Sequence, residues 1–241
     1  MDVDFSVASR GDWRDWILAH DRTRPFAYIV TPNVDHVVRL SREAELGPLY
    51  DGAAARICDS RVLSKLARTR GHALKVYPGS DIVHDLLEDP RARGCRIGIC
   101  GPSRADFATL QARYPDHDLA WIDAPFMKVG DANWQRVLGD IEAAQADLLL
   151  LCISFPKQEF MAHALKERGT AVGMGLCVGA SLDFLTGQQR RAPKLVQRLS
   201  LEWLHRLLGD PRRLWRRYLV DGPKIFGLYL RREVFGPGSD R

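Results

Sequence analysis

The chain has 241 residues, of which 46% are hydrophobic, and it carries a formal net charge of +5. This length and apolar content suffice for one sizeable core, so we expect a single α/β domain with an appendage rather than two full domains. None of the five cysteines forms a Cys-x-x-Cys pair, which argues against a structural zinc site or a redox motif. No uncharged run reaches the ~20 apolar residues of a spanning helix, and the acidic N-terminus does not match an export signal. We therefore expect a cytoplasmic protein.

Strand-like runs rich in Ile, Val and Leu alternate with segments of helical period along most of the chain. The predicted strands are 26–30, 96–100, 119–122, 148–153 and 171–178, and the helices predicted after the first four are 34–43, 103–114, 133–144 and 157–168. Continuously apolar strands with short connections predict an α/β, Rossmann-like, mostly parallel sheet with helices on both faces. Ligands of such sheets bind beyond the carboxyl ends of the strands, so residues just after each strand are the first candidates for a site.

The C-terminal part has a different character. Residues 190–232 contain twelve Lys or Arg and three acidic residues, a local charge of +9 that leaves −4 for the remainder. From residue 194 onward, apolar residues recur at helical spacing among basic residues and tryptophans, which predicts a basic amphipathic helical appendage. We therefore divide the chain into an α/β catalytic domain at 1–193 and an appendage at 194–241. A basic appendage suits membrane lipid, a diphosphate or nucleic acid, with a solvated basic face as the alternative.

Three stretches place polar groups directly after predicted strands. The first is Thr31-Pro32-Asn33, and the second is the run Phe-Pro-Lys-Gln-Glu at 155–159. The third is Gly-Ala-Ser-Leu-Asp-Phe at 179–184, which continues to Arg-Ala-Pro at 191–193. In a parallel sheet these stretches meet at one edge, so they predict a single site.

Together with Glu-Trp-Leu-x-Arg at 202–206 and Pro-x-Arg at 211–213, these motifs resemble the WecG/TagA/CpsF glycosyltransferases (glycosyltransferase family 26). The resemblance runs from Thr31 to about Tyr218. It implies an inverting transfer of a sugar from a UDP-sugar to the hydroxyl of a sugar on polyprenyl diphosphate, in surface polysaccharide or wall polymer synthesis. Such a protein would attach peripherally to the inner face of the cell membrane through its appendage. Whether it forms a homo-oligomer is left open.

The family pattern has its general base, an aspartate, at the end of a strand before a helix, and Ala-Arg-Ile-Cys-Asp at 55–59 matches it. Asp59 is therefore the predicted base, with capping of the next helix as the alternative role. Asp51-Gly52 looks closer to the family's Asp-Gly pair but follows a helix-like stretch. Ser60 stands where glycine is common in the family.

Thr31 and Asn33 match polar positions of the family's active site. There they would orient the donor sugar or the acceptor hydroxyl. Both residues also suit the cap of the next helix, which is the alternative interpretation.

The leaving diphosphate needs its charge neutralised, by a metal ion or by arginines. The two Asp-x-Asp pairs, at 2–4 and 116–118, lie at a chain end and before a strand, so we expect no metal and no other cofactor. By resemblance, Arg206, Arg213 and Arg216 would bind the diphosphate, and their spacings of seven and three place them near one helix face. The alternative is that these arginines face only solvent or anionic lipid.

The remaining binding residues are also assigned by resemblance. Lys157, Gln158 and Glu159 would lie near the nucleotide, with helix capping as the alternative for Glu159. Gly179 would permit close backbone approach to the ligand. Asp183 would bind the uridine or ribose, or else stabilise its turn, and Arg191 belongs to the same motif block. His36 lacks any ligand spacing and is interpreted as an ordinary helix residue.

Two other classes of function remain open. A basic Rossmann-like module could bind nucleic acid through its C-terminal arginines, with an affinity that falls steeply with salt. The motifs at 31–33 and 155–159 have no obvious nucleic-acid role, so we expect no nucleic acid partner. A dinucleotide oxidoreductase is the weaker option, because the turn at 98–101 lacks the third glycine of the fingerprint.

Overall fold

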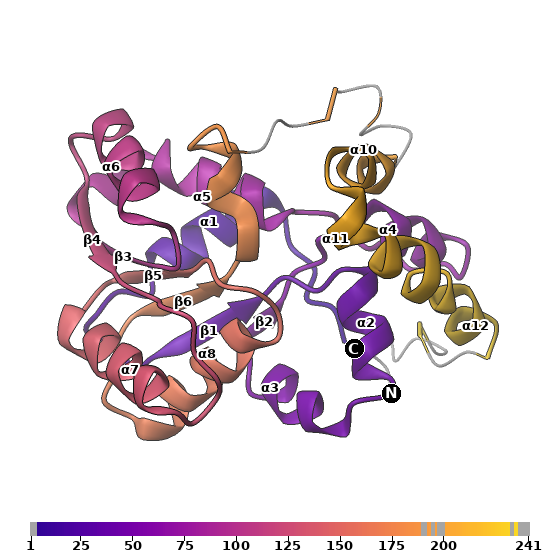
Figure 1. Ribbon diagram of the computed structural model, residues 1–241, viewed down its shortest axis with the longest axis horizontal. Coiled ribbons are helices and arrows are strands. Elements are labelled where there is room, and N and C mark those ends of the chain that lie inside the picture. Colours follow the sequence, from indigo (N-terminus) through magenta and orange to yellow (C-terminus); the bar gives the residue numbers. More distant parts are fainter. Residues whose placement is uncertain (1–3, 189–191, 194–195, 197–200, 232–233, 236–241) are drawn as a thin grey trace.

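The computed structural model describes residues 4–188, 192–193, 196, 201–231 and 234–235. Within these residues a six-stranded sheet has the order β2-β1-β6-β5-β3-β4 (Figure 1). Its strands are β1 (Ala27–Val30), β2 (Ala55–Arg56), β3 (Arg96–Cys100), β4 (Asp118–Ile122), β5 (Leu148–Leu151) and β6 (Met174–Cys177). Every pair of neighbouring strands is parallel. The predicted α/β, Rossmann-like fold is confirmed.

Helices cover both faces of the sheet (Figure 1). One face carries α1 (Arg10–Leu18), α5 (Gly79–Leu87) and α6 (Arg104–Arg113), and the other carries α3 (Gly47–Asp51), α7 (Ala132–Ala144) and α8 (Lys157–Arg168). Successive side chains of a strand point to opposite faces. Ile97 and Ile99 of β3 therefore join the first core and Cys100 joins the second.

Short polar residues begin several of these helices. The side chains of Ser103 and Asp131 accept hydrogen bonds from backbone N–H groups in the first turns of α6 and α7, as helix-capping residues do. Helix α8 ends at Gly169, whose φ of 68° suits glycine. These local signals explain why the predicted helices at 103–114 and 157–168 agree with the observed ones.

Two of the predicted strands were too long. Strand β5 ends at Leu151 rather than at 153, and β6 spans only Met174–Cys177. The apolar run continues after β5 because Cys152 and Ile153 pack against the two cores, and the Cys152 N–H also donates to the Cys100 carbonyl of β3 at 2.8 Å. An apolar pattern reports burial, which a loop over the sheet edge can share.

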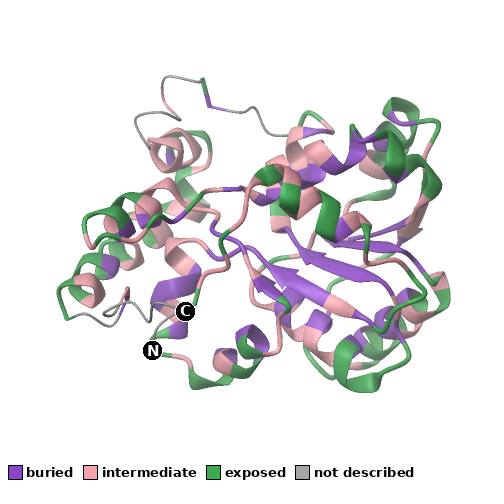
Figure 2. Ribbon diagram, turned by 180° about the vertical axis from the view of Figure 1, so that it is seen from behind, coloured by how far each residue is buried: buried purple, intermediate pink, exposed green. Residues whose placement is uncertain are grey.

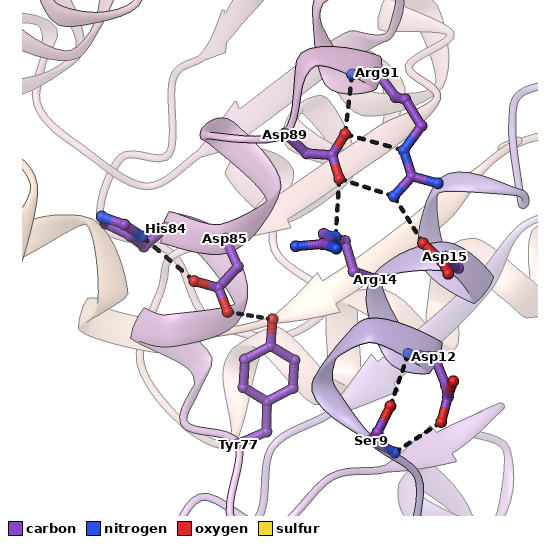
Figure 3. Close-up of polar contacts among 9 residues, drawn as sticks. All are labelled: Ser9, Asp12, Arg14, Asp15, Tyr77, His84, Asp85, Asp89 and Arg91. Carbon is purple, nitrogen blue, oxygen red and sulfur yellow. Dashed lines mark hydrogen bonds and ion pairs between the residues drawn. The ribbon is translucent and has the colours of Figure 1, made fainter.

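An ionic network joins α1 to the segment that follows α5 (Figure 3). Ser9 and Asp12 form a reciprocal capping box at the start of α1. Asp89, beyond the end of α5, contacts Arg14 of α1 at 2.8 Å and Arg91 of η2 (Pro90–Gly94) at 2.8 Å. The hydrogen bonds from Arg91 lower the pKa of Asp89 to about 2. The network fixes α5, whose first turn reaches the carboxyl edge of the sheet.

The C-terminal helices lie beside α2 (Val34–Leu40) and α4 (Arg61–Arg68), at one end of the molecule (Figure 1). They are α10 (Glu202–Gly209), α11 (Pro211–Trp215), the π-helical segment η4 (Arg216–Asp221) and α12 (Lys224–Leu230). Ile225 of α12 is buried with Val37 and Val38 of α2 in a third apolar cluster. Two further short helices within the described residues are η1 (Ala44–Leu46) and η3 (Gly179–Phe184).

Figure 2 shows that the sheet is buried, whereas the C-terminal helices are mostly intermediate or exposed. Among the described helices, none has both the length and the apolar character needed to cross a bilayer. The division into 1–193 and 194–241 stays a prediction, because residues 194–195 and 197–200 lie outside the described part.

Candidate active site

Two adjoining cavities follow the carboxyl edge of the sheet and separate it from the C-terminal helices. Their volumes are about 430 and 730 Å³. The smaller cavity extends toward Trp203 and Phe226, and the larger one reaches the ends of β1, β5 and β6. Both cavities are lined by Asn33, Asp35, Asp59, Ser80, Arg206, Arg217 and Tyr218. We treat them as one cleft with two lobes.

Thr31 and Asn33 follow β1 and line this cleft. Thr31 is 4% exposed and its hydroxyl donates to the Cys177 carbonyl at 2.8 Å, which joins the ends of β1 and β6. Asn33 caps α2 by accepting a hydrogen bond from the backbone N–H of Asp35 at 3.0 Å. The capping interpretation therefore applies to Asn33 but not to Thr31, and neither role removes the side chain from the cleft.

Asp59 follows β2 and lines both lobes. The cap of α4 is Ser60, whose hydroxyl accepts from the Leu63 N–H at 3.2 Å, so Asp59 is not the capping residue. Ser60 has an extended φ of −152°, a conformation that needs no glycine. The backbone N–H of Asp59 donates to the Pro32 carbonyl at 3.0 Å, which fixes this turn beside the end of β1.

Burial raises the pKa of Asp59 to about 7. The positive charge of Arg206 opposes this rise, as does that of Arg217, whereas the carboxylates of Glu202 and Asp81 add to it. A carboxyl group with a pKa near neutrality can exist in either protonation state in the cell, which is what general acid–base chemistry requires. Asp51, by contrast, lies at the end of α3 with 81% of its side chain exposed.

The Pro-Lys-Gln-Glu motif divides between the cleft and the core. Gln158 lines the larger lobe, and its Oε1 accepts from the backbone N–H of Gly179 at 2.8 Å. Glu159 is 0% exposed and accepts from Gln158 Nε2 at 2.9 Å. The ammonium group of Lys157 lies 4.8 Å from the ring centroid of Phe126, and Lys157 lines neither lobe. The structure thus brings Gln158, but not Lys157 or Glu159, to the cleft surface.

Gly179 and Asp183 belong to the turn after β6. Gly179 lines the larger lobe with a φ of 55°, a left-handed conformation that favours glycine. Asp183 lies in η3 and lines neither lobe. This placement supports backbone approach at Gly179 more directly than ligand contact by Asp183.

The predicted arginines have different positions. Arg206 of α10 lines both lobes, with its guanidinium 5.2 Å from the ring centroid of Phe184. Arg216 is exposed and lines neither lobe. The side chain of Arg213 and all of Arg191 lie outside the described part. Only Arg206 of the four predicted arginines is therefore seen in the cleft.

Arg217 lines the cleft although the sequence pattern singled out its neighbour. Its guanidinium lies 3.4 Å from an Asp35 carboxylate oxygen and donates to the Asn33 side-chain oxygen at 3.3 Å. Arg217 lies in η4, a π-helical segment, and such a segment changes which side chains share a face. Spacings counted on a regular α-helix could not have distinguished Arg217 from Arg216.

His36 is a second residue of the cleft that the sequence did not indicate. It is 4% exposed, lines the larger lobe, and stacks on Phe155 with ring centroids 4.0 Å apart. Its Nδ1 lies 3.0 Å from the Tyr50 hydroxyl. Burial holds the pKa of His36 well below its usual value, and the charges of Arg217 and Arg39 add to the effect. We therefore treat His36 as an uncharged side chain that lines the larger lobe.

The described residues contain no group of three or more His, Cys, Asp or Glu side chains arranged to hold a metal ion. Asp118 is the first residue of β4, at the opposite edge of the sheet, and lies 3.3 Å from Arg96. Asp2 lies outside the described residues.

Comparisons with known proteins identify the family of the chain. The model of the glycosyl transferase WecG/TagA/CpsF family matches residues 1–238. An N-acetylglucosaminyldiphosphoundecaprenol N-acetyl-beta-D-mannosaminyltransferase from Bacillus spizizenii is 28% identical over 220 residues, which cover 86% of this chain and 80% of that protein. Because the family model spans almost the whole sequence, the chain belongs to the WecG/TagA/CpsF family of glycosyl transferases.

Proposed function

We propose that the protein is an inverting glycosyltransferase that moves a sugar from a UDP-sugar onto a polyprenyl-diphosphate-linked sugar, in surface polysaccharide or wall polymer synthesis. The observation that carries this proposal is the presence of Asp59 and Arg206 on the walls of one cleft at the carboxyl edge of the sheet. The first supplies a carboxyl group whose pKa is about 7, and the second supplies a fixed positive charge. The related Bacillus protein is named for an undecaprenyl-diphosphate-linked N-acetylglucosamine acceptor, which supports the same class of acceptor here.

The chemistry divides between these two groups. The acceptor hydroxyl attacks C1 of the donor sugar from the face opposite the nucleotide, and the Asp59 carboxylate takes the hydroxyl proton as the new bond forms. The bond between C1 and the diphosphate oxygen breaks in the same step, and negative charge develops on the departing UDP. One displacement with one base inverts the configuration at C1.

The developing charge on the diphosphate requires a positive partner. Arg206 and Arg217 reach the cleft from α10 and η4. Guanidinium groups donate charge-assisted hydrogen bonds to phosphate oxygens, often in pairs. We propose that these two arginines stabilise the leaving group without a metal ion.

The two lobes differ in a way that suits two substrates. The larger lobe is lined by Thr31 and Gly179, which follow strands, and by Gln158 in the first turn of α8, and these groups suit a nucleotide. The smaller lobe is lined by Trp203, Phe226 and other apolar side chains of the C-terminal helices, which suit the acceptor. Asp59 belongs to both lobes, where the acceptor hydroxyl and the donor sugar must meet.

The C-terminal helices also suit a lipid surface. Leu208, Trp215, Leu219 and Leu230 are 74, 52, 55 and 77% exposed, and basic residues lie among them. Basic helices with exposed apolar side chains bind the interface of anionic membranes without crossing them. We propose peripheral attachment to the inner face of the cell membrane.

The test is a panel of UDP-sugars incubated with a synthetic polyprenyl-diphosphate monosaccharide. We expect one donor to give a disaccharide product by mass, with inverted configuration at C1 by NMR, and we expect Asp59→Asn to abolish it. Calorimetric titrations with UDP, NAD and an oligonucleotide separate the alternatives. Tight binding of NAD or of the oligonucleotide, with none of UDP, would refute the proposal.

A further inference from the structure

Glu159 has an unusual environment for a carboxyl group. It is 0% exposed, its Oε1 accepts a hydrogen bond from Gln158 Nε2 at 2.9 Å, and its own backbone N–H also donates to the carboxyl group. Its Oε2 is buried without a hydrogen-bond partner among the described residues. Burial raises the pKa of this carboxyl group to about 7. A half-satisfied buried carboxyl group destabilises a folded protein, so a role in stability does not explain it.

The hydrogen bonds of Gln158 connect this carboxyl group to the cleft. The carboxamide accepts from the Gly179 N–H at 2.8 Å through Oε1 and donates to Glu159 through Nε2. Turning the amide over would set its NH2 group against the Gly179 N–H, two donors facing each other. It would also set Oε1 against the carboxyl oxygen of Glu159. The two partners thus fix one orientation of an amide that lines the larger lobe.

We propose that Glu159 is a positioning residue, whose buried carboxyl group holds the Gln158 carboxamide and the Gly179 turn in the orientation that binds the nucleotide. This inference rests on the function proposed above, because it assigns the larger lobe to UDP. Gln158 keeps one N–H donor and acceptor capacity for the ligand while its other groups are engaged. Without Glu159 the amide retains a single fixed partner and samples other orientations, which weakens binding.

Three variants separate positioning from charge and from packing. Glu159→Met fills a similar volume and removes the acceptor. We expect it to raise the Kd for UDP about tenfold, the effect of one lost hydrogen bond. Glu159→Gln keeps an acceptor oxygen and should restore UDP binding close to that of the wild type. Glu167→Met, on the exposed side of the same helix, is the matched control and should leave the Kd unchanged.

A double-mutant cycle and a stability measurement complete the test. In a Gln158→Ala background, Glu159→Met should have no further effect on the Kd for UDP, since the amide that it positions is absent. The melting temperature of Glu159→Met should equal or exceed that of the wild type at about pH 8, because a buried carboxylate whose Oε2 lacks a hydrogen-bond partner is removed.

Equal losses of UDP affinity from Glu159→Met in both backgrounds, or a Glu159→Gln variant as weak as Glu159→Met, would overturn the inference. A melting temperature that falls in parallel with UDP affinity would show that Glu159 is structural. Failure of the wild-type protein to bind UDP would instead refute the proposed function itself, so the two failures are distinguishable.

Discussion

The pH dependence of transfer tests Asp59 as the general base. The carboxyl group must be ionised to accept the hydroxyl proton, and burial raises its pKa to about 7. A group with this pKa is ionised in roughly one of eleven molecules at about pH 6 and in roughly ten of eleven at about pH 8. The value of kcat/KM should therefore rise about tenfold over that range. An aspartate with the ordinary value of 3.8 would be ionised throughout and give a flat profile.

Neighbouring charges should move the rising limb of this profile in a known direction. The carboxylates of Glu202 and Asp81 raise the pKa of Asp59. Glu202→Gln and Asp81→Asn should therefore each shift the limb to lower pH, while Glu167→Gln, on the exposed side of α8, should not. A wild-type profile that is flat from about pH 6 to about pH 8, measured where chemistry limits the rate, would refute the assignment.

The same shift has a consequence for stability that needs no turnover. Because the folded-state pKa exceeds the unfolded value, the folded protein binds more protons between about pH 4 and pH 7, so stability falls as the pH rises through that window. About three pKa units correspond to an upper limit of about 4 kcal/mol. Asp59→Asn should therefore unfold at higher denaturant concentration than the wild type at about pH 8, and the difference should vanish near pH 4. If the unfolding midpoints of Asp59→Asn and the wild type differ by the same amount at both pH values, the raised pKa of Asp59 is contradicted.

Two further variants test the cleft and a third tests the proposed membrane contact of α12. Arg206→Gln should lower kcat/KM by about ten- to a hundredfold, because a charge-assisted hydrogen bond to the diphosphate is lost. Arg216→Gln, outside the cleft, should change kcat/KM far less. Equal losses from the two variants would contradict the placement of Arg206 at the diphosphate. Thr31→Val removes the hydroxyl that joins β1 to β6 at 2.8 Å and should lower the free energy of unfolding by about 1 kcal/mol in urea titrations; an unchanged midpoint would show that the bond contributes nothing. Leu230→Ser should weaken sedimentation with anionic vesicles, while Val129→Ser, 53% exposed in a loop, should not; retention of full binding by Leu230→Ser would argue against contact of α12 with lipid.

The sequence predicted most of the sheet but not every element around it. The strands at β3 and β5 are continuously apolar because helices cover both their faces, and that pattern survives in any buried parallel strand. Helix α1 was not predicted, since only Ile17 of its nine residues is fully buried and four of the others are charged. Helix α4 buries only Leu63 and Ala67. Apolar periodicity cannot reveal a helix that contributes so little to the core.

The sequence likewise located some residues of the candidate site and missed others. Residues that directly follow strands, such as Thr31, Asp59 and Gly179, could be located because the carboxyl ends of parallel strands meet at one edge. Of the C-terminal arginines, Arg206 was assigned by resemblance and lines the cleft, but Arg217 was missed because its direction depends on how η4 packs against α2. Arg217 reaches Asp35 from a π-helical segment, a local change of register that no count of residues reveals.

The protonation of Asp59 should also depend on whether a diphosphate is bound in the cleft. In the free protein the charges of Arg206 and Arg217 lower the pKa of Asp59 against the larger effect of burial. A bound diphosphate neutralises those charges and adds its own, so the pKa of Asp59 should rise when UDP binds, and the protein should take up protons at about pH 7 to 8. Calorimetric titration of UDP in buffers of different ionisation enthalpy measures this uptake, and Asp59→Asn corrects for protons bound by UDP itself. If the wild type and Asp59→Asn take up equal numbers of protons, the carboxyl group and the diphosphate do not share one cleft.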